Sequence, residues 1–463
     1  MPLTRSRLYG ALALSATLTL TGLIAGCNPP APTPEATASA GSPSASGSPS
    51  EAAAGGDKLV IAWAKWTPAD QLQKLVADYT KETGTTVEVQ QIPWSDFENK
   101  VKLAWSSQSP DYDLVIGDSQ WLGKASTAGH YVDLTDWSKT NVPMADMAKS
   151  AVTEYGEYPA GSGKLWGLPC EEDALAFAYR KDLFDDAKNK AAFKAKYGKE
   201  LAPPDTWEDF QHVAEFFTQP DKKLYGAALF YAKQYDGVTM GFDSVLWGFG
   251  GKLSDPSGKK IDGVLNDATG VKALQFYTDL KKFTPPGSEN FYFDECLRAF
   301  QQGQVAMAES WFAFLPDLND AAKNKYKGQT GYFMVPKGPA GRFVQLGGQG
   351  ISISAYSKKQ DAAKKFLSWF EKEDTQKKWV ALGGLTANTK VAATDAFKNA
   401  APYNAVFASS VPFLKDFYNT PDYSELLSSA QKNLNAAVAG AMSPKEALDT
   451  LAKEQQKVVD AAK

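Results

Sequence analysis

The strongest constraint on how this chain folds is an alternation of strand and helix patterns that begins after residue 57. Residues 59–63 form a short apolar run typical of a buried strand. In residues 68–83, apolar side chains recur three and four positions apart, as on one face of a helix. Strand patterns return at residues 87–92 and 113–116, with an amphipathic pattern at residues 97–105 between them. This β-α-β-α-β order predicts an α/β fold in which helices cover a mainly parallel sheet.

The later part of the chain shows the same two kinds of pattern. We expect helices at residues 207–218, 268–283, 294–302 and 359–380, and strands near residues 175–179 and 225–230. Ser443 begins a last helix, with Pro444 at its first position and Glu446 at its third. Ser95 and Glu98 have the spacing of a capping box. The roughly 400 residues that follow residue 56 suffice for two domains of ordinary size.

The first 56 residues have a composition of their own. Arg5 and Arg7 precede an apolar run over residues 8–24, and two small residues lead to Cys27. Residues 1–26 therefore predict a secretory signal peptide, with a transmembrane anchor as the alternative. The Ile-Ala-Gly-Cys ending resembles the lipobox of bacterial lipoproteins, which implies that Cys27 is acylated and holds the protein on a membrane. Residues 27–56 are rich in Pro, Ala, Ser, Thr and Gly, and we expect a disordered linker there.

Composition and motifs exclude several classes of function. The formal net charge is −4, and no cluster of cations suggests nucleic acid as a partner. The only histidines are His130 and His212, which stand alone, so we expect neither a metal site nor a His-based triad. No Gly-x-Ser-x-Gly motif occurs. We predict no cofactor. Beyond Cys27 the chain has Cys170 and Cys296, for which a disulfide and two buried free thiols are both open.

Four segments, in order, resemble family 1 extracellular solute-binding proteins, the maltose-binding-type receptors of ABC importers. They are residues 163–169 with 175–184, residues 299–307 with Trp311, residues 347–353, and residues 364–379 with 383–385. The resemblance implies a type II periplasmic-binding-protein fold, with two α/β lobes joined by crossover segments. It places residues 57–168 and 308–352 in lobe 1, and residues 169–307 and 353–463 in lobe 2.

The resemblance also bears on four residues, Gly348, Asn388, Cys170 and Cys296. Gly348 lies in the third crossover and is a candidate ligand contact. Asn388 stands near the position where the family often has an Arg after its late Gly pair, so it is a candidate in a place where this chain departs from the family. A bond between Cys170 and Cys296 would stiffen the base of the hinge on the lobe 2 side.

Tryptophans give the physical argument for the ligand, because the chain has 12 of them. Ligands of α/β sheets bind beyond the carboxyl ends of the strands, which selects the loops at residues 64–67, 93–95 and 117–121. An indole face packs against the apolar C–H face of a sugar ring, while carboxylates and amides bind its hydroxyls. Core packing is the alternative for each ring. The candidate rings are Trp66, Trp94, Trp121, Trp247 and Trp311, and the candidate polar groups are Lys65, Asp118, Ser119, Gln120, Glu172, Asp173, Asp243 and Glu309.

The acidic run at residues 171–173 has two functional interpretations. It could supply the carboxylate pair of a glycosidase, or it could line the cleft and accept hydrogen bonds from ligand hydroxyls. Successive residues of an extended segment point to opposite sides, so Glu171 and Asp173 share one face and Glu172 takes the other. We rate Asp173 above Glu172 as a ligand contact because it lies closer to the crossover strand.

These observations predict a monomeric, lipid-anchored receptor, without enzymatic activity, on the periplasmic or extracellular side of the membrane. It would capture a carbohydrate between its lobes and deliver it to an ABC permease. One alternative is a receptor for a polyamine or another cationic solute, since tryptophan walls with acidic rims also suit ammonium groups. Another is a secreted glycoside hydrolase that uses Glu172 or Asp173.

Overall fold

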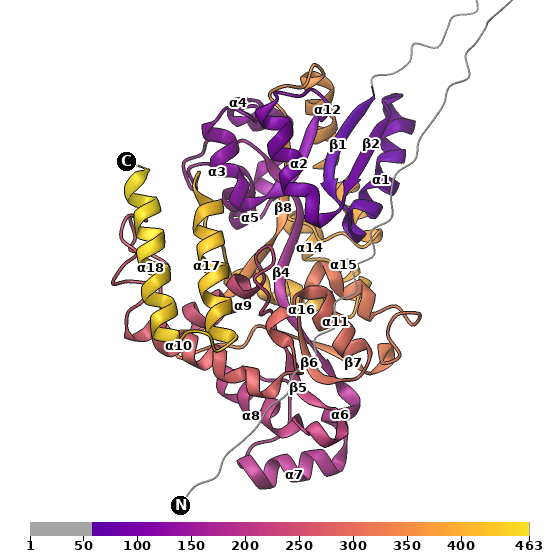
Figure 1. Ribbon diagram of the computed structural model, residues 1–463. Coiled ribbons are helices and arrows are strands. Elements are labelled where there is room, and N and C mark those ends of the chain that lie inside the picture. The colour runs from indigo at the N-terminus through magenta and orange to yellow at the C-terminus, as the bar shows by residue number, and fades with distance from the viewer. Residues whose placement is uncertain (1–57, 463) are drawn as a thin grey trace, which may run out of the picture. The chain divides into compact units, whose positions relative to one another are not determined.

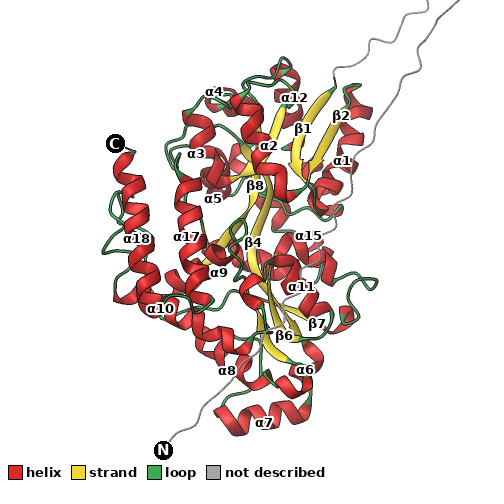
Figure 2. Cartoon of the chain, in the orientation of Figure 1, coloured by secondary structure: helices red, strands yellow, loops and turns green. Residues whose placement is uncertain are grey.

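The computed structural model describes residues 58–462. The predicted signal peptide (residues 1–26), the predicted linker (residues 27–56) and Cys27 lie outside the described residues. Within the described part of the chain, no helix has both the length and the apolar character needed to cross a bilayer. Figure 2 shows helices on both sides of a central set of strands.

The first sheet has the topology that the N-terminal pattern predicts. Strand β1 (Leu59–Ala64) pairs in parallel with β2 (Val87–Ile92) and β3 (Leu114–Asp118), and helices α1 (Thr67–Thr83) and α2 (Trp94–Ser106) connect them. The predicted β-α-β-α-β order is therefore confirmed. The predicted capping box is wrong, because α2 begins at Trp94, and Ser95 lies inside the helix.

Strand β4 (Leu168–Arg180) belongs to two sheets and joins them. Its first half pairs antiparallel with β8 (Val344–Ile353), which in turn pairs with β3 of the first sheet. Its second half pairs antiparallel with β6 (Val305–Trp311) and β7 (Thr330–Met334). In Figure 1, β4 runs from the β8 region down to β6 and β7. Strand β5 (Tyr225–Ala228) extends the second sheet in parallel with β6, and β9 (Leu414–Lys415) pairs with β8.

The helices predicted at residues 207–218 and 294–302 and the strand predicted at residues 225–230 match within two residues, and the capping box at Ser443 is present. Strand β4 is longer than the strand predicted near residues 175–179, and the helix predicted at residues 268–283 is an α-helix that ends at Asp279 and a 3-10 helix at Leu280–Phe283. The predicted helix at residues 359–380 is two helices, because the backbone leaves the helical conformation at Lys372. The remaining helices are α3 (Ser119–Thr127), α4 (Thr135–Asn141), α5 (Lys149–Gly156), α6 (Lys181–Asp185), α7 (Ala187–Tyr197), α8 (Trp207–Phe217), α9 (Gly237–Gly248), α10 (Ala268–Asp279), α11 (Phe293–Gln301), α12 (Gln360–Phe370), α13 (Glu373–Ala381), α14 (Thr389–Ala392), α15 (Asp395–Ala400), α16 (Asn404–Ser410), α17 (Tyr423–Val438) and α18 (Pro444–Ala461).

The contacts favour a different division into lobes from the predicted one. Strands β6 and β7 contain residues assigned to lobe 1, yet both pair with β4 in the second sheet. Helices α12 and α13 were assigned to lobe 2, yet they pack on α1 and β8 beside the first sheet. The aromatic contact between Tyr79 of α1 and Phe366 of α12, with ring centroids 5.2 Å apart, belongs to this packing. A lobe boundary that follows the sheets thus differs from one that follows the family's crossovers.

The two remaining cysteines are free, so of the two alternatives that the sequence left open the structure has buried free thiols and not a disulfide between Cys170 and Cys296. Cys170 lies on β4 at a register shift opposite β8, among groups of the first sheet. Cys296 lies on α11, which packs against β6 of the second sheet. Both thiols are buried, and burial raises the pKa of each well above its usual value. They are inert core residues, Cys170 on a strand that joins the first sheet and Cys296 on a helix that packs against the second.

This assignment predicts the result of a thiol-labelling experiment on the full chain. After denaturation without reductant, iodoacetamide should alkylate both Cys170 and Cys296, because neither is in a bond. Peptide mass spectrometry measures this directly. The folded protein, in which both thiols are buried, serves as the control and should be labelled far more slowly. A peptide pair joined through these two cysteines would contradict the assignment.

Candidate functional site

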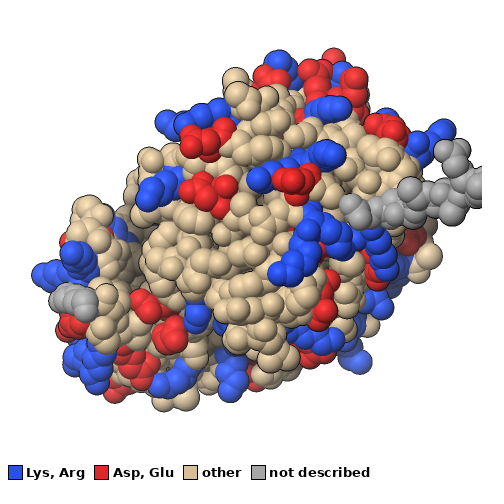
Figure 3. Space-filling view, turned by 90° about the horizontal axis from the view of Figure 1, so that it is seen from above, with Lys and Arg blue, Asp and Glu red and all other residues tan. Residues whose placement is uncertain are grey.

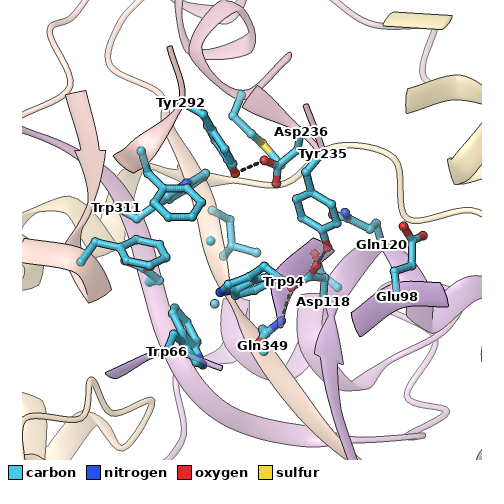
Figure 4. Close-up of a pocket in the computed structure, with 18 of the residues that line it drawn as sticks. Trp66, Trp94, Glu98, Asp118, Gln120, Tyr235, Asp236, Tyr292, Trp311 and Gln349 are labelled. Atoms are coloured by element: carbon cyan, nitrogen blue, oxygen red, sulfur yellow. Dashed lines mark hydrogen bonds between the residues drawn. The ribbon is translucent and has the colours of Figure 1, made fainter. Parts of the chain in front are cut away.

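A cavity of about 410 Å³ lies beside the β4–β8 ladder, where the two sheets meet. Its walls come from the loops after β1, β2, β3 and β5, from β8, and from the region of α11 and β6 (Figure 4). The lining residues are Trp66, Trp94, Glu98, Asn99, Asp118, Ser119, Gln120, Asp173, Gln234, Tyr235, Asp236, Met240, Tyr292, Phe293, Trp311, Phe314, Leu346, Gly347, Gly348 and Gln349.

One wall of the cavity is aromatic. Trp66 is the residue before α1, and its ring lies 5.4 Å from Trp94 and 5.5 Å from Phe314, measured between ring centroids. Phe314 stacks on Phe293, with centroids 4.3 Å apart. Trp311 ends β6 and completes this wall (Figure 4). The rings thus come from both sheets and offer flat apolar faces to one space.

The opposite wall is acidic and organised around Asp118 at the end of β3. Its carboxylate accepts hydrogen bonds from the Gln349 side-chain amide and from the Tyr235 hydroxyl. The Trp63 indole donates to the other end of the Gln349 amide, which fixes the orientation of that amide. Burial raises the pKa of Asp118 well above its usual value, and the bond from Gln349 offsets part of this effect. Asp118 therefore links the first sheet, β8 and the loop before α9.

Two further carboxyls of the cavity are also buried. Asp173 on β4 accepts hydrogen bonds from the backbone N–H groups of Ala174 (2.7 Å) and Ala313 (3.1 Å). Burial raises its pKa to about 8. Asp236 precedes α9 and accepts a hydrogen bond from the Tyr292 hydroxyl, and burial raises its pKa to about 7. Both groups can exchange between hydrogen-bond donor and acceptor near neutral pH.

Three donors in the cavity wall are available to a ligand. The indole N–H groups of Trp66 and Trp94 and the side-chain amide nitrogen of Gln120 are buried, and the described residues offer them no acceptor. No Lys, Arg or His side chain is among the described residues that line the cavity. The cavity thus combines apolar faces, neutral donors and carboxyls. This combination suits a hydroxyl-rich or cationic molecule and disfavours an anion.

The structure brings eight of the 15 predicted ligand contacts into this cavity: Trp66, Trp94, Asp118, Ser119, Gln120, Asp173, Trp311 and Gly348. It places Lys65 at the exposed surface. Trp121 packs in the core instead, with its ring 5.1 Å from that of Phe97, because its side chain lies back across Gly117. Figure 3 shows the outer surface seen from above, where cations and carboxylates are interspersed.

The other five predicted contacts lie outside the cavity for separate reasons. Glu172 is buried on the other side of β4 from Asp173, as the strand alternation requires. Glu309 is buried on β6 and accepts the backbone N–H of Phe230 at 2.7 Å. Asn388 caps the N-terminus of α14 through its side-chain oxygen. Asp243 and Trp247 are a special case, because they continue a face of α9 that does reach the cavity.

Sequence reasoning missed the segment at residues 234–236, which lines the cavity beside α9. The sequence did contain a signal for this segment, because the loop follows strand β5. The rule that ligands bind beyond the carboxyl ends of strands was applied only to the loops after β1, β2 and β3, and it would also have selected this loop. Tyr292, Phe293 and Phe314 were missed as well. They lie at the start of α11 and in the turn after β6, and no spacing in the sequence points to a common cavity.

Comparisons with known proteins agree with this geometry. The family described as bacterial extracellular solute-binding protein matches residues 63–377. A probable amino-acid ABC transporter periplasmic-binding protein of Sinorhizobium fredii is 24% identical, over 81% of this chain and 83% of that protein. A mannitol-binding protein of Pseudomonas aeruginosa is 27% identical, over 55% of this chain and 54% of that protein. An ABC transporter solute-binding protein of Agrobacterium radiobacter K84, solved in complex with ribitol, superposes with a TM-score of 0.75. It is 26% identical, and the match covers 87% of this chain and 99% of that one.

Buried carboxyls predict how stability depends on pH. Burial raises the pKa of Glu309 to about 8, and those of Glu172, Asp173 and Asp416 also to about 8. Each group holds its proton more tightly in the folded chain, so its contribution to stability is largest below the unfolded pKa of about 4 and is lost as pH rises through the folded value. The melting temperature of the protein should therefore fall as the pH rises toward about 8.

The variant Glu309→Gln should flatten this pH profile. It removes one titrating group but keeps an acceptor for the Phe230 N–H. The unfolding free energy, plotted against pH, should have a slope that is smaller by about 1.4 kcal/mol per pH unit between the unfolded pKa of about 4 and the folded pKa of about 8. Thermal or urea unfolding at a series of pH values measures it. Glu425→Gln, at an exposed site on α17, should leave the slope unchanged. An unaltered slope in Glu309→Gln would contradict the shifted pKa.

Proposed function

This chain belongs to the family of bacterial extracellular solute-binding proteins, and from that premise we propose that it captures a carbohydrate or polyol between its two lobes for an ABC importer. One observation carries the proposal. Tryptophans from both sheets and neutral or acidic hydrogen-bonding groups meet in a single cavity without a lysine or arginine among the described lining residues. Sugar rings and polyols need such a mixture of flat apolar faces and hydroxyl partners.

The cavity also supports a choice between the ligands named for the relatives. Mannitol and ribitol, named for two of them, are chains of hydroxyl groups. An amino acid, suggested by the name of the third, carries a carboxylate that needs a cationic partner or a cluster of backbone donors. The described lining residues supply no such cation, and the carboxyls of Glu98, Asp118, Asp173 and Asp236 bring no positive charge to the cavity. A polyhydroxylated ligand is therefore favoured over an amino acid.

Capture in this proposal is binding without bond-making. A ligand that contacts Trp66 and Asp118 on one side and Trp311 and Asp173 on the other stabilises a closed form only through contacts that the open form lacks. Glu172 and Asp173, the pair invoked for hydrolysis, point to opposite sides of β4, and only Asp173 reaches the cavity. A monomeric receptor without hydrolytic activity is thus the better account.

The N-terminal segment completes the proposal. Residues 1–26 direct export, and Cys27 carries the lipid that anchors the receptor to a membrane, facing the periplasm or the extracellular side. A linker over residues 27–56 would give the lobes reach toward the permease, which consumes ATP elsewhere. The Ile-Ala-Gly-Cys sequence supports this part of the proposal.

A tryptophan truncation tests the proposed site. Trp311→Ala should weaken binding of a sugar or polyol tenfold or more, about 1.4 kcal/mol, because it removes a ring face from the cavity wall. Ligands are first found by thermal shift with mannitol, ribitol, glucose and maltose, since a ligand of the folded state raises the melting temperature. Isothermal titration calorimetry then gives the affinities. Trp137→Ala, on α4 away from the cavity, should bind normally. Unchanged affinity in Trp311→Ala would remove this ring from the site.

The four carboxyls of the cavity favour a cationic solute as the second candidate, and ionic strength separates the two. The affinity for a neutral polyol should change less than twofold between about 0.05 and 0.5 M NaCl, because an uncharged ligand forms no ion pair that salt could screen. Binding of a polyamine such as spermidine should weaken steeply over the same range, because salt screens charge pairs. Titrations at both salt concentrations decide between them. Tight, salt-sensitive spermidine binding with no response to any sugar or polyol would overturn the carbohydrate proposal.

A further inference from the structure

Two tyrosines from the second-sheet side reach carboxyls on the first-sheet wall of the cavity. The Tyr235 hydroxyl donates a hydrogen bond to Asp118, at the end of β3 (Figure 4). The Tyr423 hydroxyl donates in the same way to Glu98, on α2. Asp118 and Glu98 both line the cavity. We call these two hydrogen bonds the tyrosine clasp.

The first tyrosine of the clasp lies in the loop between β5 and α9 and is fixed from both sides. The backbone of Tyr235 has a φ of +50°, in the left-handed region that side-chain-bearing residues rarely adopt. An unfavourable conformation of this kind persists where surrounding contacts fix it. The next residue, Asp236, is held by the hydroxyl of Tyr292 on the second-sheet side, while Tyr235 itself is held by Asp118 across the cavity. The ring of Tyr235 also meets Trp94, at the start of α2, with centroids 5.8 Å apart.

The second tyrosine begins α17, a helix that packs on α9, α10 and α18. In Figure 1, α17 extends from the α10 region to α3. Lys102 of α2 donates a hydrogen bond to the Ser424 hydroxyl at 2.9 Å and forms an ion pair with Glu98 at 2.8 Å. Its ammonium also lies 5.2 Å from the centroid of the Tyr423 ring. Glu98 and Lys102, one turn apart on α2, therefore bind the first turn of α17 together.

The segment that leads into α17 makes a further close contact with the first-sheet side. The backbone of Thr420 lies against Gly123 of α3, where a Cβ would come within 2.9 Å of the Thr420 carbonyl carbon. Ser119, at the start of α3, hydrogen-bonds the side chain of Asp416. The second-sheet side thus contacts β3, α2 and α3 in turn, and the clasp belongs to one continuous contact.

The clasp favours the closed arrangement of the lobes over an open one. A hydrogen bond between two lobes breaks when the lobes separate, so it stabilises the closed form alone. Hydrogen bonds to a carboxylate are among the stronger ones in proteins. A carboxylate has about four acceptor positions, so Asp118, which accepts from Gln349 and Tyr235, keeps positions for the hydroxyls of a ligand. The clasp and a ligand can therefore use the same carboxyl at the same time.

We propose that Tyr235 and Tyr423 are positioning residues, which close the two lobes through hydrogen bonds within the chain. The clasp holds the closed form whatever the ligand is, and a ligand adds its own contacts to walls that the chain has brought together. Release of any ligand then requires both tyrosine hydrogen bonds to break. This inference goes beyond the proposed function, because it does not depend on the chemistry of the ligand.

The experiment removes the two hydroxyls and keeps the rings. Tyr235→Phe, Tyr423→Phe and the double variant are made in the full chain. Tyr225→Phe, on β5 and outside the described lining of the cavity, is the matched control. Circular dichroism and thermal unfolding establish that each variant folds.

A distance across the clasp is the first readout, and it needs no ligand. Nitroxide labels are attached at Ser106→Cys, at the end of α2, and at Ser428→Cys, on α17, which are both exposed positions. Cys170 and Cys296 are buried in the folded chain and stay unlabelled. Pulsed electron double resonance should give mainly one short separation while both tyrosines are present. The double variant should gain a population with a longer separation, and the control variant should not.

The rate of ligand release is the second readout. Stopped-flow tryptophan fluorescence follows mannitol, ribitol and maltose, because tryptophans line the cavity. The double variant should release each ligand that binds at least about fivefold faster than the unmodified protein, since opening no longer breaks the clasp. The factor should be about the same for every ligand, and association should be no slower. A role in folding stability alone would lower the melting temperature and leave these release rates unchanged.

The possible results separate the clasp from the proposed function. An unchanged separation between the labels in the double variant would overturn the clasp. Release that is faster for one ligand and unchanged for another would also overturn it, because the tyrosines would then be ordinary ligand contacts. If the separation increases as expected but no carbohydrate or polyol binds, the clasp stands and the proposed function fails. Each single variant should show a smaller change in the same direction, which keeps the test decisive if the double variant does not fold.

Discussion

The antiparallel ladder between β4 and β8 is the contact on which the rest of the structure depends. It is the place where the first sheet passes into the second, and its residues Asp173, Gly347 and Gln349 line the cavity. The ladder needs glycine on β8. A Cβ at Gly347 would come within 2.8 Å of the Trp311 ring, and Gly348 has a φ of +82°, which side-chain-bearing residues rarely adopt. Two glycines thus let a tryptophan and a carboxyl approach one strand.

Around this ladder the protein buries an unusual amount of acid. Asp118, Asp173 and Asp236 line the cavity, and burial raises the pKa of each. Burial of a carboxyl lowers stability unless hydrogen bonds compensate, and here tyrosine hydroxyls, the Gln349 amide and backbone N–H groups do so. Carboxyls held in this way can bind neutral polar groups, and the free-energy cost of removing water from them is smaller than for a cluster of charged carboxylates. The hydrogen bonds that stabilise the fold at these carboxyls are therefore also part of the candidate binding site.

The sequence predicted those parts of the site that follow a local rule. Trp66, Trp94 and Asp118 each come after a strand of the first sheet, and the carboxyl ends of parallel strands meet at one edge. Trp311 was found through a family resemblance. Trp121 was misassigned although it follows β3 as well, because only the packing of its ring over Gly117 shows that it points into the core. Tyr235 and Phe314 were missed because their place in the cavity depends on how the two sheets meet.

By itself, the sequence determined the alternation of strands and helices, the parallel pairing of the first three strands and the change in composition near residue 57. These properties depend on side-chain periodicity and composition, which are local along the chain. Only the tertiary structure decided that β6 and β7 join the second sheet, that Cys170 and Cys296 stay apart, and that Lys415 lies over the Trp247 ring. Those outcomes depend on contacts between segments far apart in the chain. The residue pattern within one segment does not determine how close another segment lies in the folded protein.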